Sequence, residues 1–246
     1  MSLPGALCLG TLDTIVERAG LTEVAGADGG AFLTLTSPMT PDPVGSVRVF
    51  RGASVAKVVY VGLAVPQIGL DSHMVFAFTP ADVPVPHFTL DSVQGQGSYA
   101  FHLDLIPRAD LATHLAYVDW AHTPLTETFE EVGARPGLSK AAIGPRQCAM
   151  MSPWMLVNRA DEDAFGGIGD AVKSYLEHWF SLLEAGVPET VTADVSDTDL
   201  AHRDARNRAN IFDPEVDKVW AQVERLLGAE QMEHVRRQLL DNEVPA

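Results

Sequence analysis

The fold is decided by Pro86–Asp91 (PHFTLD) and Ser98–Pro107 (SYAFHLDLIP), two stretches separated by a glycine-rich turn. Apolar residues that alternate with polar ones predict strands with one buried face. A short connection that contains glycine predicts that two such strands pair as a hairpin. We therefore expect Asp91 at the end of a strand, facing a mostly apolar interior, where a carboxyl group either holds structure or moves protons.

The same period of two appears at residues 31–36, 46–51 and 73–79, which we also expect to be strands. Residues 55–63 are apolar and β-branched at their centre, which fits either a strand or a buried helix. Consecutive strands joined by short turns, without alternating helices, favour an antiparallel sheet onto which helices pack.

Helices are expected at both ends of the chain. A short opening helix ends near Gly20, and residues 108–120 fit a second helix. Residues 148–157 fit a further strand. Two amphipathic helices, at residues 168–183 and 216–227, then follow with a polar loop between them.

Composition excludes several classes of protein. The 246 residues can bury a sizeable core and show no linker or repeat, which favours a single domain spanning residues 1–246. No apolar run approaches the ~20 residues that span a bilayer, and no secretory signal begins the chain, so we expect a soluble, cytoplasmic protein. The formal net charge of −16 disfavours nucleic acid as a partner.

Metal and nucleotide sites are not expected either. The two cysteines, Cys8 and Cys148, are isolated, and none of the eight histidines pairs with another His or Cys at ligand spacing on one element, which leaves open only a metal site assembled from distant segments. The glycine-rich signatures of nucleotide binding and the common hydrolase motifs are absent from the sequence.

Several motifs together resemble the ferredoxin-dependent bilin reductases, to which the red chlorophyll catabolite reductases are related. The resemblance covers roughly residues 45 to 241, and no single motif is specific alone. It rests on Pro86-x-Phe88-x-x-Asp91, Leu103–Pro107, Ser152-Pro153, Ser174–Trp179 and Val216–Gly228.

The resemblance implies an α/β/α sandwich whose central antiparallel sheet and C-terminal helices enclose an open-chain tetrapyrrole. It also implies that neither metal nor flavin is bound tightly. Electrons then come one at a time from reduced ferredoxin, while side chains deliver protons to bilin radicals.

Residue by residue, the resemblance makes Asp91 the proton donor on the sheet side and Asp217 the acid on the helix side. It places Lys218 at a propionate of the bilin, and Arg146 is a second candidate for that contact. An acid whose pKa is raised by burial can protonate a basic radical, and a buried propionate needs a cationic partner. Structural interpretations stay open for each residue. Asp91 could cap the turn that follows it, Asp217 could be stabilised by the dipole at the start of a helix, and Lys218 could be a solvated helix residue.

The sequence departs from the family pattern at two neighbouring strands. Members that form phycocyanobilin carry a Glu and a His where this chain has Gly62 and Met74. His73 replaces the missing His only if the strand register slips by one residue. These losses favour reduction of a methine bridge or an end-ring diene over reduction of an exovinyl group. We expect Met74, Gly62, Phe88 and Ser152 to contact the substrate.

The expected activity is reduction of a biliverdin-like bilin by electrons from ferredoxin or flavodoxin. An acidic ferredoxin docks best on a basic surface, and because the net charge of this chain is −16, such a surface can only be a local basic patch. Two alternatives remain: a non-catalytic bilin carrier, and a reductase of a chlorophyll-derived open-chain tetrapyrrole.

Overall fold

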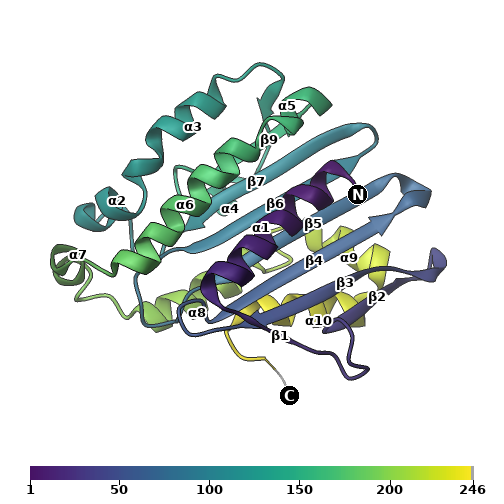
Figure 1. The fold of residues 1–246 in the computed structure, drawn as a ribbon, viewed down its shortest axis with the longest axis horizontal. Coiled ribbons are helices and arrows are strands. Elements are labelled where there is room, and N and C mark those ends of the chain that lie inside the picture. Colours follow the sequence, from purple (N-terminus) through teal and green to yellow (C-terminus); the bar gives the residue numbers. More distant parts are fainter. Residues whose placement is uncertain (245–246) are drawn as a thin grey trace.

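A wide antiparallel sheet forms the centre of the molecule (Figure 1). The computed structural model describes residues 1–244, and within them nine strands follow the order β1-β3-β4-β5-β6-β7-β9-β8, with β2 also paired to β3. The strands are β1 (Thr22–Val24), β2 (Leu33–Ser37), β3 (Thr40–Arg51), β4 (Lys57–Val65), β5 (Leu70–Phe78), β6 (His87–Gly95), β7 (Ser98–Ile106), β8 (Leu138–Lys140) and β9 (Leu156–Ala160).

Helices cover both faces of the sheet, as Figure 1 shows. The face that we call the α6 face packs against α1 (Leu3–Ala19), α2 (Leu115–Ala121), α3 (Thr126–Gly133), α5 (Glu162–Gly166), α6 (Gly169–Ala185) and α7 (Glu189–Asp194). The opposite α9 face packs against α8 (Leu200–Ile211), α9 (Val219–Leu227) and α10 (Ala229–Leu240). The short α4 (Pro145–Cys148) precedes β9, and 3₁₀ turns occur at Pro66–Ile68 and Thr123–Leu125.

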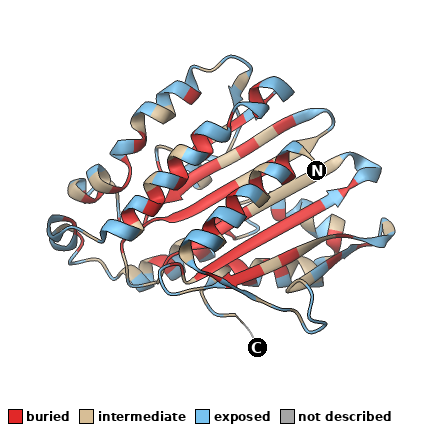
Figure 2. Cartoon of the chain, in the orientation of Figure 1, coloured by how far each residue is buried: buried red, intermediate tan, exposed pale blue. Residues whose placement is uncertain are grey.

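Each central strand therefore contributes to two cores, because successive side chains point to opposite faces. On β5, for example, Val75 and Ala77 enter the α6-face core, whereas Phe76 and Phe78 enter the α9-face core. The middle strands are accordingly buried over much of their length (Figure 2). The α/β/α sandwich with a central antiparallel sheet, expected from the sequence, is confirmed.

Five local expectations are resolved or corrected. Residues 57–65 are a strand, β4. The helix expected at 108–120 begins only at Leu115, and residues 148–157 enter a strand only at Leu156. The polar loop after α6 contains α7 and α8, and α9 begins at Val219 rather than at residue 216. No helix found in residues 1–244 is long and apolar enough to cross a membrane.

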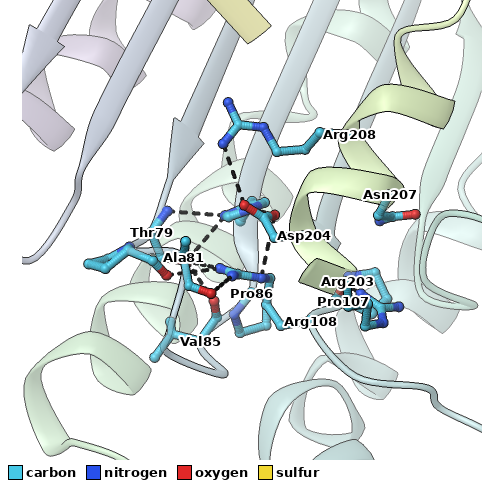
Figure 3. A network of polar contacts seen from close by, with 12 residues as sticks. Thr79, Ala81, Val85, Pro86, Pro107, Arg108, Arg203, Asp204, Asn207 and Arg208 are labelled. Atoms are coloured by element: carbon cyan, nitrogen blue, oxygen red, sulfur yellow. Dashed lines mark hydrogen bonds and ion pairs between the residues drawn. The ribbon is translucent and has the colours of Figure 1, made fainter. Parts of the chain in front are cut away.

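A buried polar network joins α8 to the sheet (Figure 3). His87 Nε2 donates to Asp204 Oδ1 at 2.7 Å, and the backbone N–H of Thr79 donates to His87 Nδ1 at 3.0 Å. Arg108 and Arg208 approach the same carboxylate at 3.6 and 3.7 Å. Burial lowers the pKa of His87 to about 3. Burial alone would raise the pKa of Asp204, but His87 and the two arginines lower it to about 2.

Candidate active site

Two adjoining cavities lie between the α9 face of the sheet and the helices that cover it. Their volumes are about 340 and 190 Å³, and both are lined by Phe76, Asp91, Phe212 and Asp217. The walls of the larger cavity are mainly apolar, and its other residues include Leu35, Val61, Leu63, Leu70, Met74, Val219, Trp220, Val223, Leu226 and Leu227. The smaller cavity adds His102, Ile143, Gln147, Met151, Met155, Val157 and Ile211.

Asp91 occupies the middle of β6 rather than its end, and it lines both cavities. Its neighbours across the sheet are Met74 on β5 and His102 on β7. Asp91 Oδ1 is shielded from solvent and has no hydrogen-bond partner among the described residues. The hairpin turns at Gln96 and Gly97, whose φ angles of 51° and 80° are left-handed, so Asp91 does not cap this turn.

His102 is a residue that the sequence analysis missed. Its Nδ1 lies 3.3 Å from Asp91 Oδ2, and its Nε2 is buried without a partner in the described structure. Burial pulls the pKa of His102 down, but the hydrogen bond to Asp91 and the nearby Asp104 and Asp217 carboxylates together raise it above its ordinary value. The sequence contains the information that would have found His102, because a hairpin that turns at residues 96 and 97 pairs position 91 with position 102.

Asp217 approaches the cavities from the helix side, in the loop before α9. Burial and the nearby Asp91 carboxylate raise the pKa of Asp217, which favours its protonated form. The residue also has a structural contact, because Val219 N donates to its Oδ1 at 3.0 Å. The Asp213 carboxylate accepts from Glu215 N at 2.7 Å and so stabilises the preceding turn, not the start of α9.

The register of β4 and β5 corrects two expected site residues. Met74 lines the larger cavity, whereas His73 points to the α6 face, where its Nδ1 lies 2.7 Å from Tyr60 Oη. Gly62 is paired with His73 and shares that face, so it does not border the cavity. Val61 is the residue that lies beside Met74 on the cavity side. The register therefore does not slip in the way that a role for His73 required.

Phe88 and Ser152 also lie outside the two cavities. Phe88 is fully buried on the α6 face and packs against Trp179, with ring centroids 5.7 Å apart. Ser152 is buried beside β7, where its hydroxyl donates to Asp104 Oδ1 at 2.5 Å and its backbone N–H donates to Oδ2 at 3.0 Å. Burial raises the pKa of Asp104. Ser152 thus holds an acid near His102 instead of lining the cavity.

The two expected cations lie in solvent outside the cavity walls. The side chain of Lys218 is 70% exposed and pairs with Glu215 at 3.3 Å. Arg146, exposed on α4, donates to the Glu215 carbonyl at 3.4 Å. No Lys or Arg is among the described residues that line either cavity. Nor does the described chain place three or more His, Cys, Asp or Glu side chains where they could hold a metal.

Comparison with solved structures identifies the class of fold. The chain matches phytochromobilin synthase from tomato, crystallised in complex with biliverdin, with a TM-score of 0.73, 13% identity and coverage of 97% of this chain and 84% of that one. It therefore shares the fold of this synthase.

Sequence comparison gives a second match. The chain is 26% identical to red chlorophyll catabolite reductase 1, chloroplastic, from Oryza sativa subsp. japonica, over 88% of this chain and 78% of the rice protein. No protein-family model matches the chain. The resemblance to the ferredoxin-dependent bilin reductases and their relatives, expected from the sequence, is confirmed by these two similarities.

Proposed function

We propose that this protein reduces a linear tetrapyrrole bound between the α9 face of the sheet and α9. The observation that carries the proposal is the pair of carboxyl groups, Asp91 from the sheet and Asp217 from the helix side, that border one apolar space. A flat conjugated ligand in this space meets an acid from each side. The similarities to a tetrapyrrole reductase and to a biliverdin-bound fold support this class of ligand.

The proposed chemistry alternates electrons with protons. A one-electron donor of the ferredoxin or flavodoxin type reduces the bilin, and the radical anion that forms is more basic than the oxidised bilin. A nearby carboxylic acid then protonates it as a general acid. Burial raises the pKa of Asp217, which keeps a proton available on this side chain at higher pH. Asp91 would deliver the proton from the other side without movement of the ligand.

The propionates of the bilin are placed at the rim. The apolar walls contain no described cation that could neutralise a buried carboxylate, and such burial is costly. Lys218 and Arg146 are exposed near the loop that carries Asp217, and both contact Glu215. We assign them the propionate contacts, which would form in a partly solvated setting.

A spectroscopic titration tests the proposal. Purified protein mixed with biliverdin should shift and sharpen the long-wavelength absorption band, and reduced ferredoxin should then bleach or shift it as product forms. Absence of any perturbed band would refute the proposal. A perturbed band that reducing equivalents leave unchanged would indicate a bilin carrier. Replacement of the exposed Asp163 by Asn is the matched control for variants of Asp91 and Asp217.

The similarity to the rice enzyme favours a second candidate substrate, an open-chain tetrapyrrole derived from chlorophyll. The same titration with red chlorophyll catabolite distinguishes the two substrates by their relative kcat/KM. We also propose a reducing compartment such as the cytoplasm, because Cys8 and Cys148 are free thiols.

A further inference from the structure

His102 occupies a place on the cavity wall that the two-acid mechanism does not use. On β7, His102 is paired with Asp91 of β6 on one side and with Val157 of β9 on the other. Its side chain borders the smaller cavity together with Asp91 and Asp217. Three groups that can carry protons therefore line one space.

Only one of the two ring nitrogens of His102 has a hydrogen-bond partner among the described residues. Nδ1 contacts Asp91 Oδ2 at 3.3 Å, which occupies one ring nitrogen, whereas Nε2 is buried and has no partner among the described residues. Oδ1 of Asp91 is unpartnered as well. Buried polar atoms are nearly always satisfied, so two such atoms without a protein partner beside a cavity need an explanation, and a catalytic role is one of them. Nε2 and Oδ1 are thus available to a ligand with polar ring nitrogens.

The charges around the imidazole favour its protonated form. Asp91 faces it from β6, Asp104 from the same strand and Asp217 from the loop before α9. Its neighbours on β9 and in residues 143–155 are uncharged, namely Val157, Ile143, Gln147, Met151 and Met155. The hydrogen bond to Asp91, together with the nearby Asp104 and Asp217, outweighs the effect of burial and raises the pKa of His102. An imidazolium here can donate from both nitrogens.

We propose that His102 is a third proton donor, which passes its Nε2 proton to the bilin after an electron has been added. This inference rests on the proposed function. The N–H bond of the imidazolium breaks and a new N–H or C–H bond forms on the bilin, while the electron comes from the external ferredoxin-type donor. His102 becomes neutral, stays hydrogen-bonded to Asp91 through Nδ1 and regains a proton from solvent between turnovers.

The test compares His102→Gln and His102→Ala with wild type in single turnovers over a range of pH, with His202→Gln as control. His202 is exposed on α8 and is not among the described residues that line either cavity. We expect both His102 variants to bind biliverdin and to lose about 10²- to 10⁴-fold in the protonation rate. The fall in rate with rising pH that marks the imidazolium should disappear in both variants. Added imidazole should restore part of the rate in His102→Ala, and the protonated form should be responsible.

The outcomes separate this inference from the proposed function. The Gln side chain of His102→Gln still keeps a donor toward Asp91. If this variant has the wild-type rate and pH profile, His102 is not a proton donor, and the two-acid mechanism stays intact. Loss of rate in His102→Ala with full recovery in His102→Gln would mean that His102 only positions Asp91, which also overturns proton donation. Failure of wild type to bind or reduce any tetrapyrrole would overturn the proposed function, and the inference with it.

Discussion

The charge of Asp204 is expected to be essential for stability, and Asp204→Asn tests this with little change in side-chain shape. Its carboxylate is the counter-charge for two fully buried arginines, Arg108 and Arg208, and it accepts a 2.7 Å hydrogen bond from His87. The substituted amide can still accept from His87 but leaves both cations without a nearby negative charge. Breaking a buried ion pair from one side costs about 3–5 kcal/mol.

That cost is large compared with total stability, which is about 5–15 kcal/mol for most proteins. In a chain of this length the loss corresponds to a fall of roughly 6–20 °C in Tm, at about 2–4 °C per kcal/mol. Urea unfolding at pH 7.5, followed by circular dichroism, measures it directly. The exposed Asp42→Asn is the matched control and should change stability by less than about 0.5 kcal/mol. A loss below about 1 kcal/mol in Asp204→Asn would refute the assigned role.

Three further outcomes are expected. Burial lowers the pKa of His87 to about 3, so His87 should stay neutral in a heteronuclear NMR titration from pH 7.5 to 4.5. Its contribution to the stability of the fold should fall as the pH drops from about 6.5 toward 3, because the unfolded chain then takes up a proton that the folded His87 does not. An imidazole that titrates near pH 6.5 would contradict this. Gly62→Ala places a Cβ 2.6 Å from Tyr60 Oη on the α6 face, so it should lower the free energy of unfolding in urea by about 1–3 kcal/mol. Biliverdin binding should not weaken, because this face is opposite the cavities. Impaired binding at unchanged stability would disprove the assigned face. Asp217→Asn should retain the bound-bilin spectrum but slow turnover by about 10²- to 10⁴-fold, and a variant that turns over normally would remove Asp217 as an acid.

Much of the sheet was predictable because its strands follow a period of two and meet in glycine-containing turns. The hairpin that carries Asp91 formed where the sequence indicated it. The α8 helix was missed because its buried positions include the charged Asp204 and Arg208, which a search for apolar periodicity does not detect. Residues 148–157 misled for the opposite reason: Met151 and Met155 are apolar because they line a cavity, not because they belong to a strand.

The site was predictable only in part. Asp91, Asp217 and Met74 line one cavity although Asp217 is distant from the others in sequence; the family resemblance predicted that the two acids face one ligand, and their roles there stay predictions. The orientation of His73 and Gly62 depends on register, since a shift of one residue exchanges the two faces. His102 escaped notice because its importance comes from its neighbour across the hairpin, a relation that requires the turn to be located first.

Electron paramagnetic resonance of Asp91→Asn, bound to biliverdin and supplied with reduced ferredoxin, measures the role of Asp91 most directly. Asn cannot donate the proton, so we expect the one-electron-reduced bilin radical to accumulate while product formation stops. Wild type should pass through the same radical only transiently. If Asp91→Asn forms product at the wild-type rate without a persistent radical signal, the proposal that an acid on the sheet protonates the reduced bilin is contradicted.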